Sequence, residues 1–492
     1  MDGRAGEVVL VVSDAAEIPA GSLTSTGILM TTADAPDVLP IGVRSLAGGL
    51  AAVDETLFLG RELRRFGFVR TAEQRREAGR LLTMLGVDAA PSSPMVDLGE
   101  EDRLLVAVGQ ALVRRPAVVV IEQRGLSVGA DHRFADAIGL LRDAGTRVFV
   151  LGGRVTAWAE TADRVVAVRA GAVAGELTTR RGDGTPVRHD ELLDGIVGLL
   201  APGDPWASHN TAETDRAARF ADRAHIPAPG ATPHADRREL GVRSIWDTEG
   251  RPAVLAVNDW TVEPPSGHRP VARGVTLQVH AGEMVALIGD GSAELIASLF
   301  ARGFGERISG SVTVDGVRTD HLTPERSVRA GIAYASEQPL VFEVSTIGGL
   351  STRVSSETLA TLTRIGLVDR RRQHIAGRAS ARSRSRAAEA SAGYTTALEA
   401  WATALENGGD TVPTTGMPVP RVVLLDDPFA SERDRRLGVV RRLARAGTAM
   451  LLGVTSVDDA LAIADRVLVC ADGVIREPAR PGAGGILREL LS

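Results

Sequence analysis

The chain has 492 residues, of which 44% are hydrophobic, and this content excludes a mainly disordered protein. At about 150 residues per domain, the length predicts about three domains or two larger ones. The net charge of −6 gives no overall reason to expect nucleic acid as a partner. All 56 basic residues are arginine, so any site that requires a lysine ammonium is excluded.

Apolar runs along the chain are of strand length. The longest, such as residues 117–121, are too short to cross a membrane, and residues 8–12 are too short for the apolar core of a signal peptide. Cys470 is the only cysteine, and its apolar neighbours predict a buried strand residue. A single cysteine cannot form a disulfide within the chain, which fits a reducing compartment. We therefore expect a cytoplasmic protein, either soluble or peripheral at the inner face of the membrane.

Strands and helices alternate along both halves of the chain. Thr71 and Gln74 form a capping-box pattern that predicts a helix over 71–85, with Leu81, Leu82 and Leu85 as its apolar face. Each half then runs strand, helix, strand and short helix before a closing strand. The predicted strands are 117–122, 147–152 and 162–168 in the first half, and 421–427, 449–455 and 465–469 in the second. This internal duplication predicts an α/β fold with parallel sheets.

Turn-rich segments divide the chain. Residues 202–239 contain many Pro, Gly and Ser residues and little apolar periodicity. We therefore expect a first domain over 1–201, a linker over 202–245 and a second domain over 246–492. A second break is the arginine-rich segment 370–386, whose composition predicts a mobile, solvated insertion.

An ordered series of motifs gives the second half a family resemblance. The segments are Ala281-Gly-Glu-Met-Val-Ala-Leu-Ile-Gly-Asp-Gly-Ser-Ala-Glu-Leu295, Gly310–Gly316, Gly331–Glu337, Leu424-Leu-Asp-Asp-Pro428 and Ala464–Val469, with Glu55-Thr-Leu-Phe-Leu-Gly-Arg-Glu62 in the first half. In this order they resemble the ATP-binding-cassette (ABC) ATPases of bacterial ribose-, galactose- and xylose-type importers, which carry two nucleotide-binding domains in one chain. The resemblance implies two tandem P-loop NTPase-like domains, the first truncated, each with a mainly parallel sheet and a helical subdomain.

The resemblance also implies a site for ATP and Mg²⁺. The nucleotide-binding positions would be Gly289, Asp290, Gly291, Ser292 and Ala293, together with Ser391 and Gly393 of the signature segment 390–394. The metal would be held by Asp426 and Glu337, and Asp427 would stand at the position of the catalytic base. The alternative reading of these residues needs no ligand: the glycines form a strand-to-helix turn, and the two aspartates cap a strand end.

The second half departs from the family pattern at the positions that carry the chemistry. Aligned over 286–293, the pattern puts its first glycine at Ala286, its lysine at Ser292 and its Mg²⁺-binding hydroxyl at Ala293. Loss of one charge-assisted phosphate contact costs about 1.5–3 kcal/mol. Asp427 is one methylene shorter than the expected glutamate, which misplaces a general base. No histidine stands near Thr455, where the family has one.

The first half departs further. Its Q-loop equivalent is expected near Ala33 and Asp34, which leaves too little chain upstream for a P-loop and its sheet. Its signature analogue, 98–102, contains three carboxylates, which would repel phosphate and also suit a helix N-terminus. Glu122 replaces the Walker B aspartate, and Gln123 at the base position cannot accept a proton. Gly153 stands at the histidine position.

Three functional hypotheses follow. The first is a catalytically impaired subunit (a pseudo-ATPase) that docks on or regulates a membrane permease, alone or paired with an active ATPase subunit. The second is a slow ATPase in which Arg302 or Arg307 replaces the lysine. The third is a soluble scaffold, unrelated to transport, that binds acidic partners through 378–386. In the first two, the membrane is contacted only through the permease, and no nucleic acid is expected.

Overall fold

The chain divides into two compact units. The computed structural model describes residues 6–14, 38–41, 51–122, 132–152, 155, 161–204, 253–263, 271–300, 307–319, 324–336, 340–346, 351–355, 368–378, 384–412, 418–429, 432–480 and 482–492. Unit 1 comprises Met1–Pro227, Ser266–Arg269 and Ala479–Ser492, and unit 2 comprises Ala228–Pro265 and Pro270–Pro478. Most of the expected linker, 202–245, lies outside the described residues. Within the described ranges, no helix combines the length and apolarity needed to cross a bilayer.

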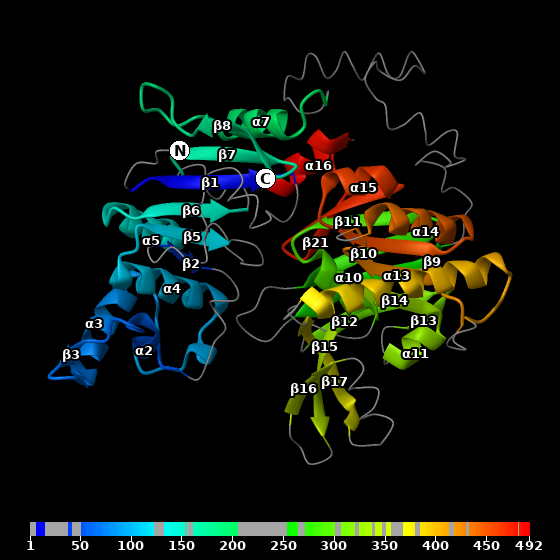
Figure 1. The fold of residues 1–492 in the computed structure, drawn as a ribbon, viewed down its shortest axis with the longest axis horizontal. Coiled ribbons are helices and arrows are strands. Elements are labelled where there is room, and N and C mark those ends of the chain that lie inside the picture. Colours follow the sequence, from blue (N-terminus) through cyan, green and yellow to red (C-terminus); the bar gives the residue numbers. More distant parts are fainter. Residues whose placement is uncertain are drawn as a thin grey trace. The chain divides into compact units, whose positions relative to one another are not determined.

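Unit 1 is built on a six-stranded sheet in the order β2-β5-β6-β1-β7-β8 (Figure 1). Its strands are β1 (Val8–Ser13), β2 (Val38–Ile41), β5 (Val118–Glu122), β6 (Arg147–Leu151), β7 (Arg164–Arg169) and β8 (Ala172–Thr178). Every neighbouring pair is parallel except β7 and β8. The central strand β1 is a continuous apolar run with its first five residues buried, as expected for a strand covered on both faces.

The described residues of unit 1 form six α-helices. They are α2 (Val53–Leu57), α3 (Thr71–Met84), α4 (Glu100–Arg114), α5 (His132–Asp143), α7 (His189–Leu200) and the C-terminal α16 (Gly482–Leu491), with a 3-10 turn η1 (Met95–Asp97). A small hairpin of β3 (Arg64–Arg65) and β4 (Phe68–Val69) joins α2 to α3. The predicted helix over 71–85 is confirmed, but its capping box is wrong, because Arg70 is the N-cap residue and provides no side-chain cap. Gln74 is buried instead, and its Nε2 donates to the carbonyl of Asp54 over 3.3 Å.

Unit 2 repeats the same sheet order, β14-β18-β19-β11-β20-β21. Its strands are β11 (Met284–Gly289), β14 (Ile332–Ser336), β18 (Val422–Asp426), β19 (Ala449–Val454), β20 (Arg466–Ala471) and β21 (Val474–Arg476). All neighbours are parallel except β20 and β21. The match of order and direction confirms the α/β class and the predicted duplication. Cys470 is buried in β20, as predicted.

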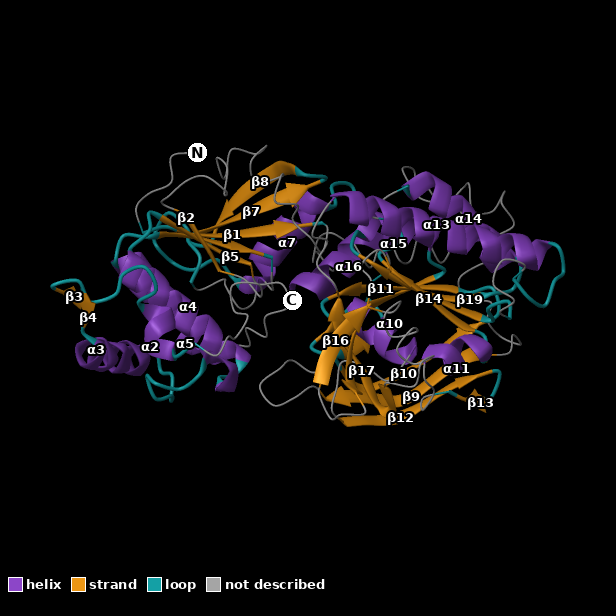
Figure 2. Ribbon diagram, turned by 60° about the horizontal axis from the view of Figure 1, so that its bottom comes forward, coloured by secondary structure: helices purple, strands orange, loops and turns teal. Residues whose placement is uncertain are grey.

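A second sheet in unit 2 is antiparallel. Its order is β10 (Ala272–His280), β9 (Ala253–Glu263), β12 (Arg307–Val314) and β13 (Val317–Arg318). One hydrophobic core joins this sheet to α10 (Ser292–Phe300) and to the parallel sheet, and Figure 2 shows α10 between the two sheets. At its centre Trp260 is fully buried, and its indole N–H donates to the Ser298 hydroxyl over 3.0 Å. The described part of the unit also contains α11 (Pro324–Arg329), α13 (Arg384–Glu406), α14 (Arg433–Arg445) and α15 (Val457–Ile463).

The arginine-rich segment is not a loop over its first part. Three antiparallel strands, β16 (Ser351–Ser355), β15 (Leu340–Thr346) and β17 (Val368–Arg378), form a small sheet, and α13 begins at Arg384. The expected mobile insertion over 370–386 is therefore wrong for 370–378, and residues 379–383 lie outside the described ranges. Pairing with β15 gives the backbone N–H and C=O groups of β17 hydrogen-bond partners. Amino-acid composition alone does not predict such pairing.

The matching sheet orders correct the first-half alignment. β1 occupies the position of β11 and β2 that of β14, so a Q-loop equivalent would follow Ile41 rather than lie near Ala33 and Asp34. The latter two residues lie outside the described ranges. The expectation that too little chain remains for the sheet is also wrong, because residues 8–13 form its central strand. In the described part of unit 1, no strands correspond to β9, β10 and β12.

Candidate functional site

The carboxyl ends of β11, β18 and β19 lie at one edge of the unit 2 sheet, which is where open α/β sheets bind ligands. Only Asp290 and Gly291 separate the end of β11 from the start of α10. The P-loop pattern places four residues between its first glycine and its Gly-Lys pair, all in the strand-to-helix connection. Here Ala286, Leu287 and Ile288, which would belong to that loop, are buried strand residues. The connection is therefore a tight turn.

Both glycines of this turn are needed for its conformation. Gly289 has φ 110° and Gly291 has φ 81°, a region that other residues rarely adopt. The carbonyl of Gly291 accepts from Leu295 N over 2.9 Å, so the helical ladder begins immediately. A two-residue turn presents few backbone N–H groups, whereas a phosphate cradle requires several in succession.

Acidic groups stand at the start of α10. Asp290 is exposed in the turn and Glu294 lies in the first helical turn. Ser292, at the expected lysine position, is buried, and Ala293 supplies no hydroxyl. Carboxylates complement the positive end of the helix dipole, and they oppose the approach of a polyphosphate. The carboxylates of Asp290 and Glu294 thus already supply negative charge at the N-terminus of α10.

Asp426 ends β18 and is buried. Its Oδ2 accepts from the Ser336 hydroxyl over 2.8 Å and from the Tyr334 hydroxyl over 3.5 Å. Ser336 stands directly opposite Asp426 in the β14–β18 register, so the sheet itself brings this donor to the carboxylate. The expected second metal ligand, Glu337, lies outside the described residues.

Asp427 adopts a left-handed backbone conformation with φ 47°. Its N–H donates to the carbonyl of Gly453 over 2.9 Å. Its Oδ1 accepts from the Thr455 hydroxyl over 3.3 Å. Thr455 comes from the segment after β19, where the resemblance predicted a histidine. The candidate base is thus positioned by a hydroxyl group, which cannot take part in proton transfer near neutral pH as an imidazole can.

A buried arginine beside this site was missed by the sequence analysis. Arg436 on α14 is completely buried. Its Nε donates to the Thr395 hydroxyl over 3.0 Å, and one terminal nitrogen donates to the carbonyl of Pro428 over 3.2 Å. Its guanidinium carbon lies 4.4 Å from the Tyr394 ring centroid. Because Pro428 follows Asp427 directly, this cation links the turn after β18 to α13.

The spacing of the apolar residues in α14 could have predicted that Arg436 is buried. The buried residues of this helix are Arg436, Val439, Val440, Leu443 and Ala444, at the i, i+3, i+4 and i+7 spacing of one helical face. Arg436 therefore lies on the apolar stripe, whereas Arg435 beside it lies on the exposed face and pairs with Glu399 over 2.9 Å.

Tyr394 is buried next to Arg436. Burial raises the pKa of its hydroxyl well above the usual value, and the nearby Arg436 guanidinium only partly opposes this shift. The hydroxyl has no hydrogen-bond partner within the described parts of the chain. Tyr394 therefore stays neutral in the folded protein.

The signature segment lies inside a helix. α13 begins at Arg384, so Ser391 and Gly393 stand about two turns from its start. Only the first four N–H groups of a helix lack an intrahelical partner. The backbone of Ser391 and Gly393 is therefore committed to the helical ladder rather than presented to a phosphate.

In unit 1 the equivalent edge carries an aspartate in place of the glycine turn. Asp14 follows β1, and its Oδ1 and Oδ2 accept from Ala170 N over 3.3 and 3.2 Å. Glu122 ends β5, the counterpart of β18. Gln123 and Gly153 lie outside the described residues.

The acidic signature analogue of unit 1 forms the start of α4, as expected for a helix N-terminus. Arg133 of α5 pairs with Glu101 over 3.3 Å and with Asp102 over 3.2 Å. This single arginine thus offsets part of the negative charge of the segment. Of the two arginines proposed to replace the lysine, Arg302 is not among the described residues, and Arg307 begins β12, opposite Glu263 in the antiparallel sheet.

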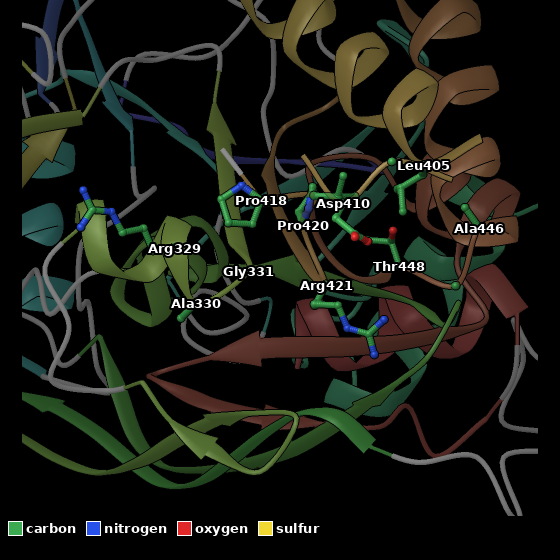
Figure 3. A pocket seen from close by; sticks show the side chains of 13 residues that line it. Arg329, Ala330, Gly331, Leu405, Asp410, Pro418, Pro420, Arg421, Ala446 and Thr448 are labelled. Carbon is green, nitrogen blue, oxygen red and sulfur yellow. The ribbon is translucent and has the colours of Figure 1, made fainter. Parts of the chain in front are cut away.

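One cavity of about 360 Å³ lies at the other edge of the unit 2 sheet (Figure 3). Its lining includes Gly331, Arg421 and Thr448, which directly precede β14, β18 and β19. It therefore opens at the amino ends of these strands and not at the edge that holds Asp426. Its Arg421 is engaged by Asp315 over 2.9 Å.

The residues of the candidate site fit a Mg²⁺-triphosphate poorly. The turn is short, its neighbours are acidic, and Asp426 already accepts two hydroxyl groups. The geometry favours a site in which Asp426 and Asp427 accept hydrogen bonds from nearby hydroxyl groups of the chain rather than bind a ligand.

Comparison with known proteins gives similarity over most of the chain, although no family model matches it. The chain is 21% identical to the L-arabinose transport ATP-binding protein AraG of Geobacillus stearothermophilus, over 86% of this chain and 76% of that protein. It is 26% identical to the ribose import ATP-binding protein RbsA 1 of Rubrobacter xylanophilus, with the same two coverages. It is 22% identical to RbsA of a Chelativorans species, over 94% and 83%.

Similarity to solved structures is weak. A structure described as the ATP-binding subunit of an ABC transporter is 19% identical, with a TM-score of 0.28, over 45% of this chain and 88% of that one.

Proposed function

Over most of its length the chain is a homologue of the ATP-binding proteins of ribose and arabinose importers, and from this premise we propose that it is a catalytically impaired subunit that docks on or regulates a membrane permease. The observation that carries the proposal is the two-residue turn between β11 and α10. A triphosphate needs a longer cradle and a cation, and the turn offers Asp290 instead.

Support for docking comes from the segment that resembles the importer branch, 55–62. This segment is firmly held against α4. Gln110 Nε2 donates to the carbonyl of Thr56 over 2.9 Å, and an Arg114 terminal nitrogen donates to the carbonyl of Leu59 over 2.9 Å. These two bonds hold the segment against α4, whereas Ser292 and Ala293 depart from the P-loop pattern. A packed helical surface of this kind fits a binding function.

Co-purification tests the proposal. The tagged full chain is expressed with the permease and any ATPase subunit encoded beside its own gene, and membranes are solubilised in mild detergent. We expect the permease to co-purify with or without ATP. Arg114→Ala, which removes the bond to Leu59, should weaken recovery, whereas Arg435→Ala in unit 2 should not. Failure to recover any permease or ATPase would refute the docking function.

A slow ATPase remains the second candidate, because Asp426 and Asp427 are both retained at the carboxyl end of β18. It requires ATP turnover above background that disappears in Asp426→Asn.

A further inference from the structure

The hairpin of β3 and β4 lies at one end of the helical region of unit 1 (Figure 1). Six large hydrophobic side chains are exposed in the described part of the chain, and four of them lie in the hairpin or shortly before it, within residues 59–69. They are Leu59, Phe66, Phe68 and Val69, and the two phenylalanines are 87% and 79% exposed. Single exposed hydrophobic residues are common, but such a cluster indicates a contact surface.

The turn of the hairpin is conformationally unfavourable for the residue it carries. Phe66 has φ 52° and Gly67 has φ 83°. Turns with two positive φ values favour Asn, Asp or Gly at the first position, so a bulky aromatic residue there is strained. The Arg65 guanidinium lies over the Phe66 ring, with its carbon 5.3 Å from the ring centroid. Strain of this kind, without burial to offset it, points to a function for the exposed ring.

The charge around the tip is opposite to that of the whole protein. Residues 61–70 contain four arginines and one glutamate, a net charge of +3, whereas the chain carries −6. Arg64 pairs with Glu62 over 3.2 Å, and Arg70 pairs with Glu73. These are exposed pairs, which bind weakly and exchange readily with other anions. Arg61 and Arg65 are also exposed.

We propose that this hairpin binds the surface of an anionic lipid bilayer. Phe66 and Phe68 would enter the interface between headgroups and acyl chains, and the neighbouring arginines would meet the lipid phosphates. Aromatic side chains favour this interface, and basic side chains add attraction to anionic headgroups. The apolar residues form a projecting turn, a shape that suits insertion into a fluid surface. This contact is independent of the permease and adds a direct membrane contact that the sequence analysis did not expect.

Co-sedimentation with vesicles tests the proposal without any permease. The full chain is titrated with vesicles of phosphatidylglycerol and phosphatidylcholine, and with vesicles of phosphatidylcholine alone. We expect binding to the anionic vesicles that weakens as salt is raised. Phe66→Ser/Phe68→Ser should reduce the affinity at least about tenfold. Val317→Ser, at a 66% exposed residue of unit 2, is the matched control and should bind like the parent chain.

Equal binding of the Phe66→Ser/Phe68→Ser variant and the Val317→Ser control would overturn the proposal, as would equal binding to both kinds of vesicle. Absence of vesicle binding, combined with loss of permease co-purification in the double variant, would assign the hairpin to a protein partner and refute the lipid contact. Both variants should keep the thermal unfolding temperature of the parent chain, because the substituted side chains are exposed.

Discussion

Arg436 and Arg435 are neighbours on α14 with opposite environments. Arg436 is buried and donates to Thr395 and Pro428, whereas Arg435 pairs with Glu399 at the surface. Removing the buried side chain leaves a cavity and unpaired polar groups, so Arg436→Ala should lower the free energy of unfolding by about 2–5 kcal/mol. Arg435→Ala, the control, should cost at most about 1 kcal/mol. Urea unfolding of both variants makes the comparison, and equal losses would show that the buried network contributes nothing.

Tyr394 offers a second test at a single residue. Its buried hydroxyl has no partner in the described part of the chain, so Tyr394→Phe should be neutral or stabilising by up to about 1 kcal/mol.

The same hydroxyl gives a pH dependence. Its pKa is raised by burial, so above the ordinary value of 10.0 the unfolded chain releases this proton while the folded chain keeps it. The unfolded state then binds fewer protons, and stability falls as the pH rises through this range. Unfolding midpoints measured between pH 8 and 11 should show a smaller loss in Tyr394→Phe than in the parent chain. Parallel curves for the two proteins would contradict the buried, neutral assignment.

Gly310 affects the pairing of two strands, because it stands where the register between β9 and β12 shifts. It has φ 91°, and an added Cβ would lie 2.3 Å from the carbonyl oxygen of Asp259. Gly310→Ala should therefore cost about 2–4 kcal/mol. Gly316→Ala, at φ 79° but in open space, should cost only about 1 kcal/mol. Fluorescence of Trp260, buried in β9, provides a readout, and a similar loss at both positions would refute the steric argument.

Elements with strong local signals could be predicted from the sequence. The strands β5, β6, β18 and β19 are apolar runs of strand length, and α3 has a clear apolar face, so their positions follow from periodicity. β17 was missed because its residues give no such pattern and its partner, β15, is distant in the sequence. β1 was missed because a short apolar run near the chain start has several interpretations until its parallel neighbours β6 and β7 are known.

The sequence indicated where the candidate site lies, but it did not predict the length of its loop or its side-chain contacts. The order of the motifs singled out Asp426, Asp427 and the glycine turn, which stand at the carboxyl ends of β18 and β11. The spacing 286–293 suggested a full-length loop, because sequence alone does not show where β11 ends. Buried side-chain networks such as Arg436 with Thr395 depend on helix packing and need the tertiary structure.

At the scale of the whole molecule, the last helix of the chain belongs to the first unit. α16 packs on α7, where Gly484 N donates to Asp204 Oδ2 over 2.8 Å and Arg488 pairs with Asp194. Leu487 of α16 is buried. Unit 1 is therefore completed by residues that follow unit 2 in the sequence.

Leu487→Ala tests this arrangement. It should destabilise unit 1 by about 2–5 kcal/mol, since it leaves a cavity in a buried contact. Hydrogen exchange should then quicken in α7 and β7, while β18 and β19 of unit 2 keep their protection. Faster exchange confined to unit 2 would contradict the assignment of α16 to unit 1.

The proposed function requires that the short turn at Gly289–Gly291 does not hold nucleotide. The most direct measurement is calorimetric titration of the purified full chain with Mg-ATP, accompanied by an assay of phosphate release. We expect no binding at millimolar ATP and no turnover above background. Micromolar binding, with turnover that is lost in Asp426→Asn, would contradict the proposed function and establish a slow ATPase.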